Sequence, residues 1–128
     1  TAGTFLFVIS DFVPMPSNTV WFTAIENRWD VVPVVIQDPT WEQSFPDIAG
    51  IAVPLRDAES GRTIHVRLKR DEIATRRSAN EERIANLLSR FQELDLDPIL
   101  VSSSEPSEIL SSFLEWAELR RVRRVVQA

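Results

Sequence analysis

The most constraining feature of this chain is an apolar run near its start that ends in a carboxylate. Residues 5–12 read Phe-Leu-Phe-Val-Ile-Ser-Asp-Phe. An unbroken apolar run of this length, bounded by polar residues, is typical of a strand that is buried on both faces of a sheet. Asp11 then follows the strand at its carboxyl end, where open α/β sheets bind their ligands. The run therefore predicts a strand in a covered sheet and makes Asp11 the first candidate site residue.

Apolar periodicity predicts that strands and helices alternate along the rest of the chain. We expect parallel strands at about 5–9, 31–37 and 98–102, an inserted β-hairpin at about 51–57 and 62–68, and helices at about 18–28, 71–93 and 105–125. This order predicts a small three-layer α/β fold, with residues 1–128 forming a single domain. Pro33 cannot donate to a strand ladder, so we expect a bulge or an edge position there.

Composition excludes several classes of protein. The chain has 128 residues and a formal net charge of −5, which argues against nucleic acid as the main partner because phosphate binding needs a basic surface. It contains no cysteine and a single histidine, His65, so thiolate chemistry and sites built from several imidazoles are excluded. No apolar run approaches the length of a membrane span, which favours a cytoplasmic protein, although its parent protein could be membrane-associated.

Three parallel strands form a narrow sheet, and the strand Phe5–Ile9 is too apolar to lie at an open edge. Exposed apolar edges are association sites because their backbone amides and carbonyls lack partners. We therefore expect this edge to pair with a second copy of the chain. Two-fold symmetry then gives an antiparallel homodimer.

Four segments carry a resemblance to a known family. They are Val8-Ile9-Ser10-Asp11-Phe12, Trp29–Val34 leading to Asp38-Pro39, Phe45–Gly50, and Leu55–Arg62 with its Asp-Ala-Glu-Ser-Gly turn. The pattern resembles the second half of a von Willebrand factor A-like domain. It looks most like a large family of uncharacterised bacterial proteins that carry such a domain near the C-terminus, and whose genes often neighbour those of MoxR-type AAA+ ATPases.

The resemblance implies a doubly wound sheet with metal ligands at its carboxyl edge. Asp11 matches the last acidic ligand of that site. The Asp-x-Ser-x-Ser motif that supplies the first ligands is absent from this chain, and so is the strand that carries it. The chain therefore resembles a C-terminal half-domain with an incomplete metal site.

Two functions follow as hypotheses. The first is a non-catalytic adaptor module that works with a protein partner, as the resemblance implies a MoxR-type AAA+ ATPase. The alternative is a metal-dependent phosphoesterase in which Asp11, Asp38 and Glu42 hold Mg²⁺ or Mn²⁺, since hard cations prefer carboxylate oxygens. Asp11 also has a simpler interpretation as a turn residue that accepts hydrogen bonds from nearby backbone amides.

Other groups of residues have two interpretations each. The basic group Arg67, Lys69, Arg70, Arg76 and Arg77 could dock an acidic partner or a nucleotide, or it could form a solvated helix start. Arg120, Arg121, Arg123 and Arg124 crowd the end of the last helix, where cations complement the helix dipole. Trp41 could anchor an interface or pack under its own loop.

Overall fold

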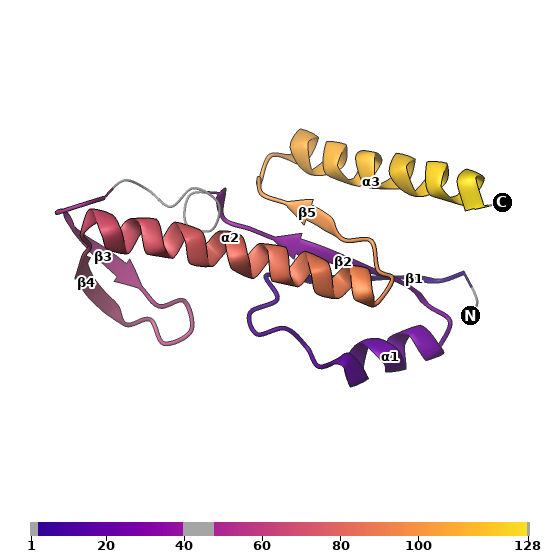
Figure 1. Cartoon of the computed structure of the whole chain (residues 1–128), viewed down its shortest axis with the longest axis horizontal. Coiled ribbons are helices and arrows are strands. Elements are labelled where there is room, and N and C mark those ends of the chain that lie inside the picture. The colour runs from indigo at the N-terminus through magenta and orange to yellow at the C-terminus, as the bar shows by residue number, and fades with distance from the viewer. Residues whose placement is uncertain (1–2, 40–47, 128) are drawn as a thin grey trace. The chain divides into compact units, whose positions relative to one another are not determined.

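The computed structural model describes residues 3–39 and 48–127, and it confirms a small α/β fold (Figure 1). The chain divides into two compact units, one formed by Thr1–Asp38 with Ala85–Ala128 and the other by Pro39–Ile84. The single domain expected over residues 1–128 stays a prediction.

A parallel three-stranded sheet forms the centre of the first unit. Its strands are β1 (Phe5–Ser10), β2 (Asp30–Ile36) and β5 (Ile99–Val101), in the order β1-β2-β5. All three strands start and end within two residues of the predicted positions. In the register of this sheet, Phe7 lies beside Val32, and Val34 lies between Ile9 and Ile99.

Helices cover both faces of this sheet. Helix α3 (Pro106–Gln127) packs its Ile109, Phe113 and Trp116 against a buried cluster on one face, formed by Val32, Val34, Ile99 and Val101. Helix α1 (Asn18–Glu26) and the end of helix α2 (Arg70–Glu93) lie on the side away from α3 (Figure 1). The first unit therefore has the predicted three layers.

Three aromatic rings form the core on the side of α1. Phe12, Trp21 and Phe91 lie with their ring centroids 5.2 to 5.9 Å apart, and all three are buried. The guanidinium of Arg90 donates two hydrogen bonds to Oδ1 of Asn18, which ties the end of α2 to the start of α1.

Pro33 occupies a position that the sequence analysis predicted wrongly. It lies in the central strand, fully buried, and the register of β2 against β1 runs through it without a bulge. The hydrogen bond from the Gln37 amide to the Val101 carbonyl shows that odd-numbered residues of β2 face β5. The nitrogen of Pro33 therefore faces the Asp97 carbonyl, just before β5 begins, so no hydrogen bond of the β1–β2 ladder is lost.

The second unit contains a β-hairpin and the first part of α2. Strands β3 (Ala52–Arg56) and β4 (Thr63–Arg67) pair antiparallel, as predicted. Leu68 and Ile73 form the buried core of this unit, together with the partly buried Ile48, Ala49 and Val66.

The side chain of Asp57 organises the hairpin turn. Its Oδ2 accepts a hydrogen bond from the Ser60 hydroxyl at 2.7 Å, and its Oδ1 accepts one from the Glu59 amide at 3.0 Å. Gly61 follows with φ +71°, a conformation that costs glycine nothing, and its amide donates to the Asp57 carbonyl at 2.8 Å. Asp57, Ser60 and Gly61 of the turn sequence Asp-Ala-Glu-Ser-Gly thus each have a role in this geometry.

We predict that the hairpin turn loosens in acid. The hydrogen bond from Ser60, followed by that from Glu59, lowers the pKa of Asp57 in the folded state. Its stabilising effect is therefore present above the pKa of an unfolded Asp, about 3.9, and is lost as the pH falls through the lowered value. Ser60→Ala should raise the pKa of Asp57 in a carboxyl NMR titration. Ser78→Ala, on an exposed part of α2, is the control, and equal Asp57 pKa values in the two variants would contradict this role.

Candidate functional site

The carboxyl edge of the sheet holds the first candidate residues. Asp11 directly follows β1, and Asp38 comes two residues after β2, so both lie at the ends of adjacent parallel strands. Both residues are exposed. Glu42, the third acid of the phosphoesterase hypothesis, and Trp41 lie outside the described residues.

The carboxylate of Asp11 is used within its own turn. Its Oδ1 accepts a hydrogen bond from the Val13 amide at 3.0 Å, and the preceding Ser10 hydroxyl accepts one from the Phe12 amide at 3.0 Å. Phe12 adopts φ 56°, which turns its ring into the aromatic core. This geometry fits the simpler interpretation, in which Asp11 shapes the chain as it leaves β1.

A metal site at this edge stays a prediction. Within residues 3–39 and 48–127, no three histidine, aspartate or glutamate side chains come together as they would to hold a metal ion. Because no such group of ligands is present in these parts of the chain, the described residues do not by themselves fit Mg²⁺ or Mn²⁺.

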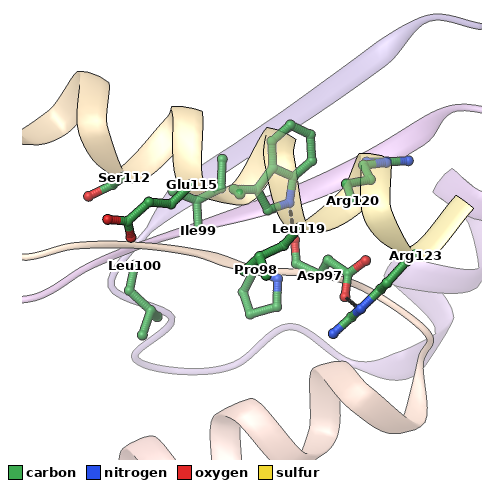
Figure 2. A pocket seen from close by; sticks show the side chains of 10 residues that line it. Asp97, Pro98, Ile99, Leu100, Ser112, Glu115, Leu119, Arg120 and Arg123 are labelled. Atoms are coloured by element: carbon green, nitrogen blue, oxygen red, sulfur yellow. Dashed lines mark hydrogen bonds and ion pairs between the residues drawn. The ribbon is translucent and has the colours of Figure 1, made fainter. Parts of the chain in front are cut away.

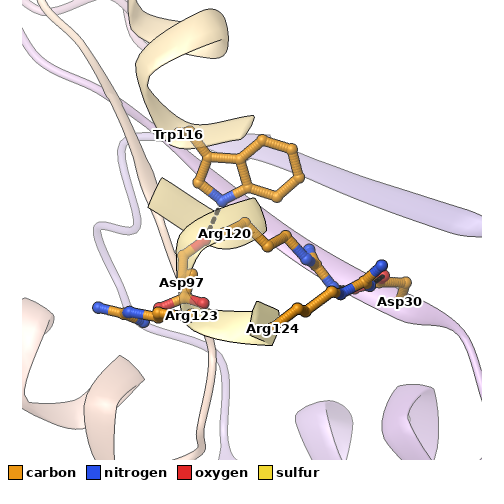
Figure 3. A network of polar contacts seen from close by, with 6 residues as sticks. All are labelled: Asp30, Asp97, Trp116, Arg120, Arg123 and Arg124. Carbon is orange, nitrogen blue, oxygen red and sulfur yellow. Dashed lines mark hydrogen bonds and ion pairs between the residues drawn. The ribbon is translucent and has the colours of Figure 1, made fainter. Parts of the chain in front are cut away.

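A network of ion pairs, which the sequence analysis missed, joins α3 to the strand starts (Figure 3). Arg120 and Arg124 both reach the carboxylate of Asp30, the first residue of β2, with Arg124 Nη2 3.6 Å from Oδ2. Arg123 pairs with the Asp97 carboxylate. The guanidinium of Arg120 also lies over the rings of Phe5 and Trp116, 5.6 and 5.0 Å from their centroids.

Trp116 satisfies the carbonyl that Pro33 leaves unpaired. Its indole Nε1 donates to the Asp97 carbonyl oxygen at 3.0 Å (Figure 3). This is the carbonyl that an amide at position 33 would face if the β2–β5 ladder continued. A side chain of α3 therefore replaces the missing donor, and this contact compensates for proline in the central strand.

A shallow pocket lies between β5 and α3 (Figure 2). It has a volume of about 320 Å³, and its lining includes Ile99, Leu100, Ser112, Glu115 and Leu119. The Ser112 hydroxyl donates to the Glu108 carbonyl within α3 at 3.1 Å, so it is engaged by its own helix. Asp97, Arg120 and Arg123 add charged groups to the lining, but both arginines are held in ion pairs with aspartates. None of these lining side chains is an activated nucleophile.

A second hollow lies on the other side of α3, at the start of β1. It has a volume of about 420 Å³. Phe5, Trp116, Ala117 and Val125 supply its apolar lining, and Arg120, Arg121 and Arg124 supply guanidinium groups. This hollow adjoins the strand edge that the sequence analysis marked as open.

The edge of β1 is open among the described residues, where β1 pairs only with β2. The side chains that line this edge on the face covered by α3 are half exposed: Phe5 at 49%, Phe7 at 43% and Ile9 at 65%. Leu110 and Leu114 of α3 are also exposed. An apolar strip therefore accompanies a row of backbone groups that can pair with a strand.

Comparisons with protein-family models, with curated proteins and with solved structures each found no match to this chain. In the parts of the chain that the structure describes, no helix is long and apolar enough to cross a membrane.

We predict that Asp11 acts on the fold without metal. Asp11→Ala should lower the free energy of unfolding by about 1 kcal/mol, because the Val13 amide loses its acceptor, and Asp11→Asn should lose less because its amide oxygen can still accept. Millimolar Mg²⁺ or Mn²⁺ should leave the melting temperature of all three proteins unchanged. A metal-dependent rise in the wild type that disappears in Asp11→Ala would instead establish a metal site, since a ligand stabilises the state that binds it.

We also predict an energetic coupling between Trp116 and Pro33. Trp116→Phe should cost about 1–3 kcal/mol because it leaves the Asp97 carbonyl without its donor, whereas Trp29→Phe is the matched control. Pro33→Ala restores an amide that faces the same carbonyl. The double variant should therefore be more stable than the sum of the single effects predicts. Additive effects in denaturant unfolding would contradict this account.

Proposed function

We propose that this chain is a non-catalytic protein-interaction module that binds a β-strand at the open edge of β1. The observation that supports this proposal is the combination of an unpaired strand edge with half-exposed Phe5, Phe7 and Ile9 beside it. Natural sheet edges of this kind are usually blocked by charges, prolines or bulges, and β1 has none of these. Its sequence instead favours pairing.

The chemistry of such a partner follows from the edge. Added strands bind through backbone hydrogen bonds, and their specificity comes from alternate side chains. On the face of β1 covered by α3, the incoming side chains would meet Phe5, Phe7 and Ile9 below and Leu110 and Leu114 above. A strand with apolar residues at alternate positions fits this surface best.

We further propose that the chain is the second half of a von Willebrand factor A-like domain and works as a cytoplasmic adaptor for a MoxR-type AAA+ ATPase. This proposal rests on the four matching segments of the sequence. The open edge supports it, because a half-domain lacks the strand that would lie beside β1.

A second copy of the chain is the simplest strand donor. An antiparallel pairing of two β1 edges joins two three-stranded sheets into a continuous sheet of six strands. The copies then bury each other's exposed aromatic strip, which association favours by about 25 cal/mol for each Å² of apolar surface removed from water.

Ile9→Lys tests the proposed edge. A lysine there should abolish strand binding because its charge would be buried against the partner, while the stability of the fold should change little since Ile9 is 65% exposed. Ile64→Lys, at a residue 55% exposed on the hairpin, is the matched control. The wild type and the control should co-isolate with the ATPase in at least one nucleotide state, and Ile9→Lys should not.

Two results would contradict the proposal. Failure of the wild type to co-isolate in every nucleotide state would remove the ATPase as the partner. Equal retention of the ATPase by Ile9→Lys and Ile64→Lys would show that binding does not use the β1 edge.

A further inference from the structure

We infer that, in a dimer formed through the β1 edge, Asp11 of each copy binds in the arginine-lined hollow at the start of β1 in the other copy. This inference rests on the proposed strand-binding function and names both the occupant and its charged contact. It gives Asp11 and the arginines of α3 a shared role that neither has in the isolated chain.

The backbone groups of the odd-numbered residues of β1 face the open side of the sheet. The Asp30 amide donates to the Thr4 carbonyl at 2.9 Å, so the even-numbered residues of β1 face β2. By alternation, Phe5, Phe7 and Ile9 present their amides and carbonyls to the open side. A two-fold axis perpendicular to the sheet keeps both α3 helices on one side and pairs odd-numbered residues with odd-numbered ones. With Phe7 beside its own counterpart, Phe5 lies beside Ile9 of the other copy.

This pairing brings the two ends of β1 together. Residue 11 of one copy comes to lie opposite residue 3 of the other, next to Phe5 and the hollow that Phe5 lines. A parallel arrangement of the same strands would place Asp11 beside Asp11, where two like charges repel. The position of the carboxylate therefore favours the antiparallel dimer.

The hollow carries a positive charge that can pair with the carboxylate of Asp11. Arg120 and Arg124 share the carboxylate of Asp30, and Arg121 pairs with Glu118 at 2.6 Å. Three guanidinium groups thus face two carboxylates, which leaves one positive charge in excess. The side chains of Arg121 and Arg124 are 74% and 69% exposed, so their donors can reach a further acceptor.

One carboxylate oxygen of Asp11 is available to accept a hydrogen bond from an arginine. Its Oδ1 accepts from the Val13 amide, while Oδ2 accepts no hydrogen bond from any residue the structure describes. The same turn that fixes Oδ1 holds the carboxylate at the exposed end of β1. Because this side chain is already ordered, binding an arginine costs it little further conformational freedom.

A charge swap in the full chain tests the inference. Dissociation constants of the dimer are measured by sedimentation for the wild type, Asp11→Arg, Arg121→Glu and the double variant. Each single variant should raise the dissociation constant about tenfold or more, because like charges meet at two symmetric positions. The double variant should return it close to the wild-type value. Glu81→Arg and Arg76→Glu, two exposed positions on α2, are the matched controls and should change nothing.

The outcomes separate this inference from the proposed function. If the wild type dimerises and the single variants behave like their controls, the Asp11 contact is wrong while pairing through β1 stands. If the wild type stays monomeric at tens of micromolar, a second copy is not the occupant, and the module is left to bind a different strand. The contact is supported only if both single variants raise the dissociation constant and the double variant restores it.

Discussion

The burial of β2 on both faces is the constraint on which the rest of this structure depends. Five consecutive residues, Val31 to Val35, are buried. A strand of this kind needs neighbours on both edges and a helix layer over each face, because its backbone groups must be paired and its side chains removed from water. Its edges are paired by β1 and β5, and its faces are covered by α1 and α3. These elements come from both ends of the chain.

The same constraint explains how the sheet tolerates a proline at its centre. Pro33 lies just before the point where β2 begins to pair with β5. The indole of Trp116 there supplies the hydrogen-bond donor that the proline lacks. Because Trp116 also packs against the buried cluster that contains Val32 and Val34, and lies under Arg120, one side chain links the proline, the core and the ion pairs.

The sequence allowed the elements of the fold to be predicted well, since apolar runs such as Val31–Ile36 and the turn residues Asp57 and Gly61 act locally. It misled at Pro33, because the residue that compensates for the proline lies far along the chain. The role of the α3 arginines was missed for a similar reason. Asp30 and Asp97, their partners, are 90 and 26 residues away from the arginines that reach them, and no local pattern connects them.

For the candidate site, the sequence identified the right strand and an ambiguous carboxylate. The apolar run Phe5–Ile9 predicted a strand buried on both faces, and this was wrong: every residue of β1 is exposed or half-buried, because the described residues place no strand on its outer side. Whether Asp11 binds metal, shapes a turn or meets a partner depends on what surrounds it in space. The structure supplies the turn contact, and it places an excess positive charge at the opposite end of the same strand.

The measurement that tests the central claim most directly is amide hydrogen exchange along β1 at low and high protein concentration. Leu6 and Val8 should be protected at both concentrations because they pair with β2. The account predicts that Phe5, Phe7 and Ile9 exchange fast in dilute protein and become protected as the concentration rises. The contradicting result is fast exchange of these three amides at every protein concentration and also in the presence of the proposed ATPase partner. The β1 edge would then not receive a strand.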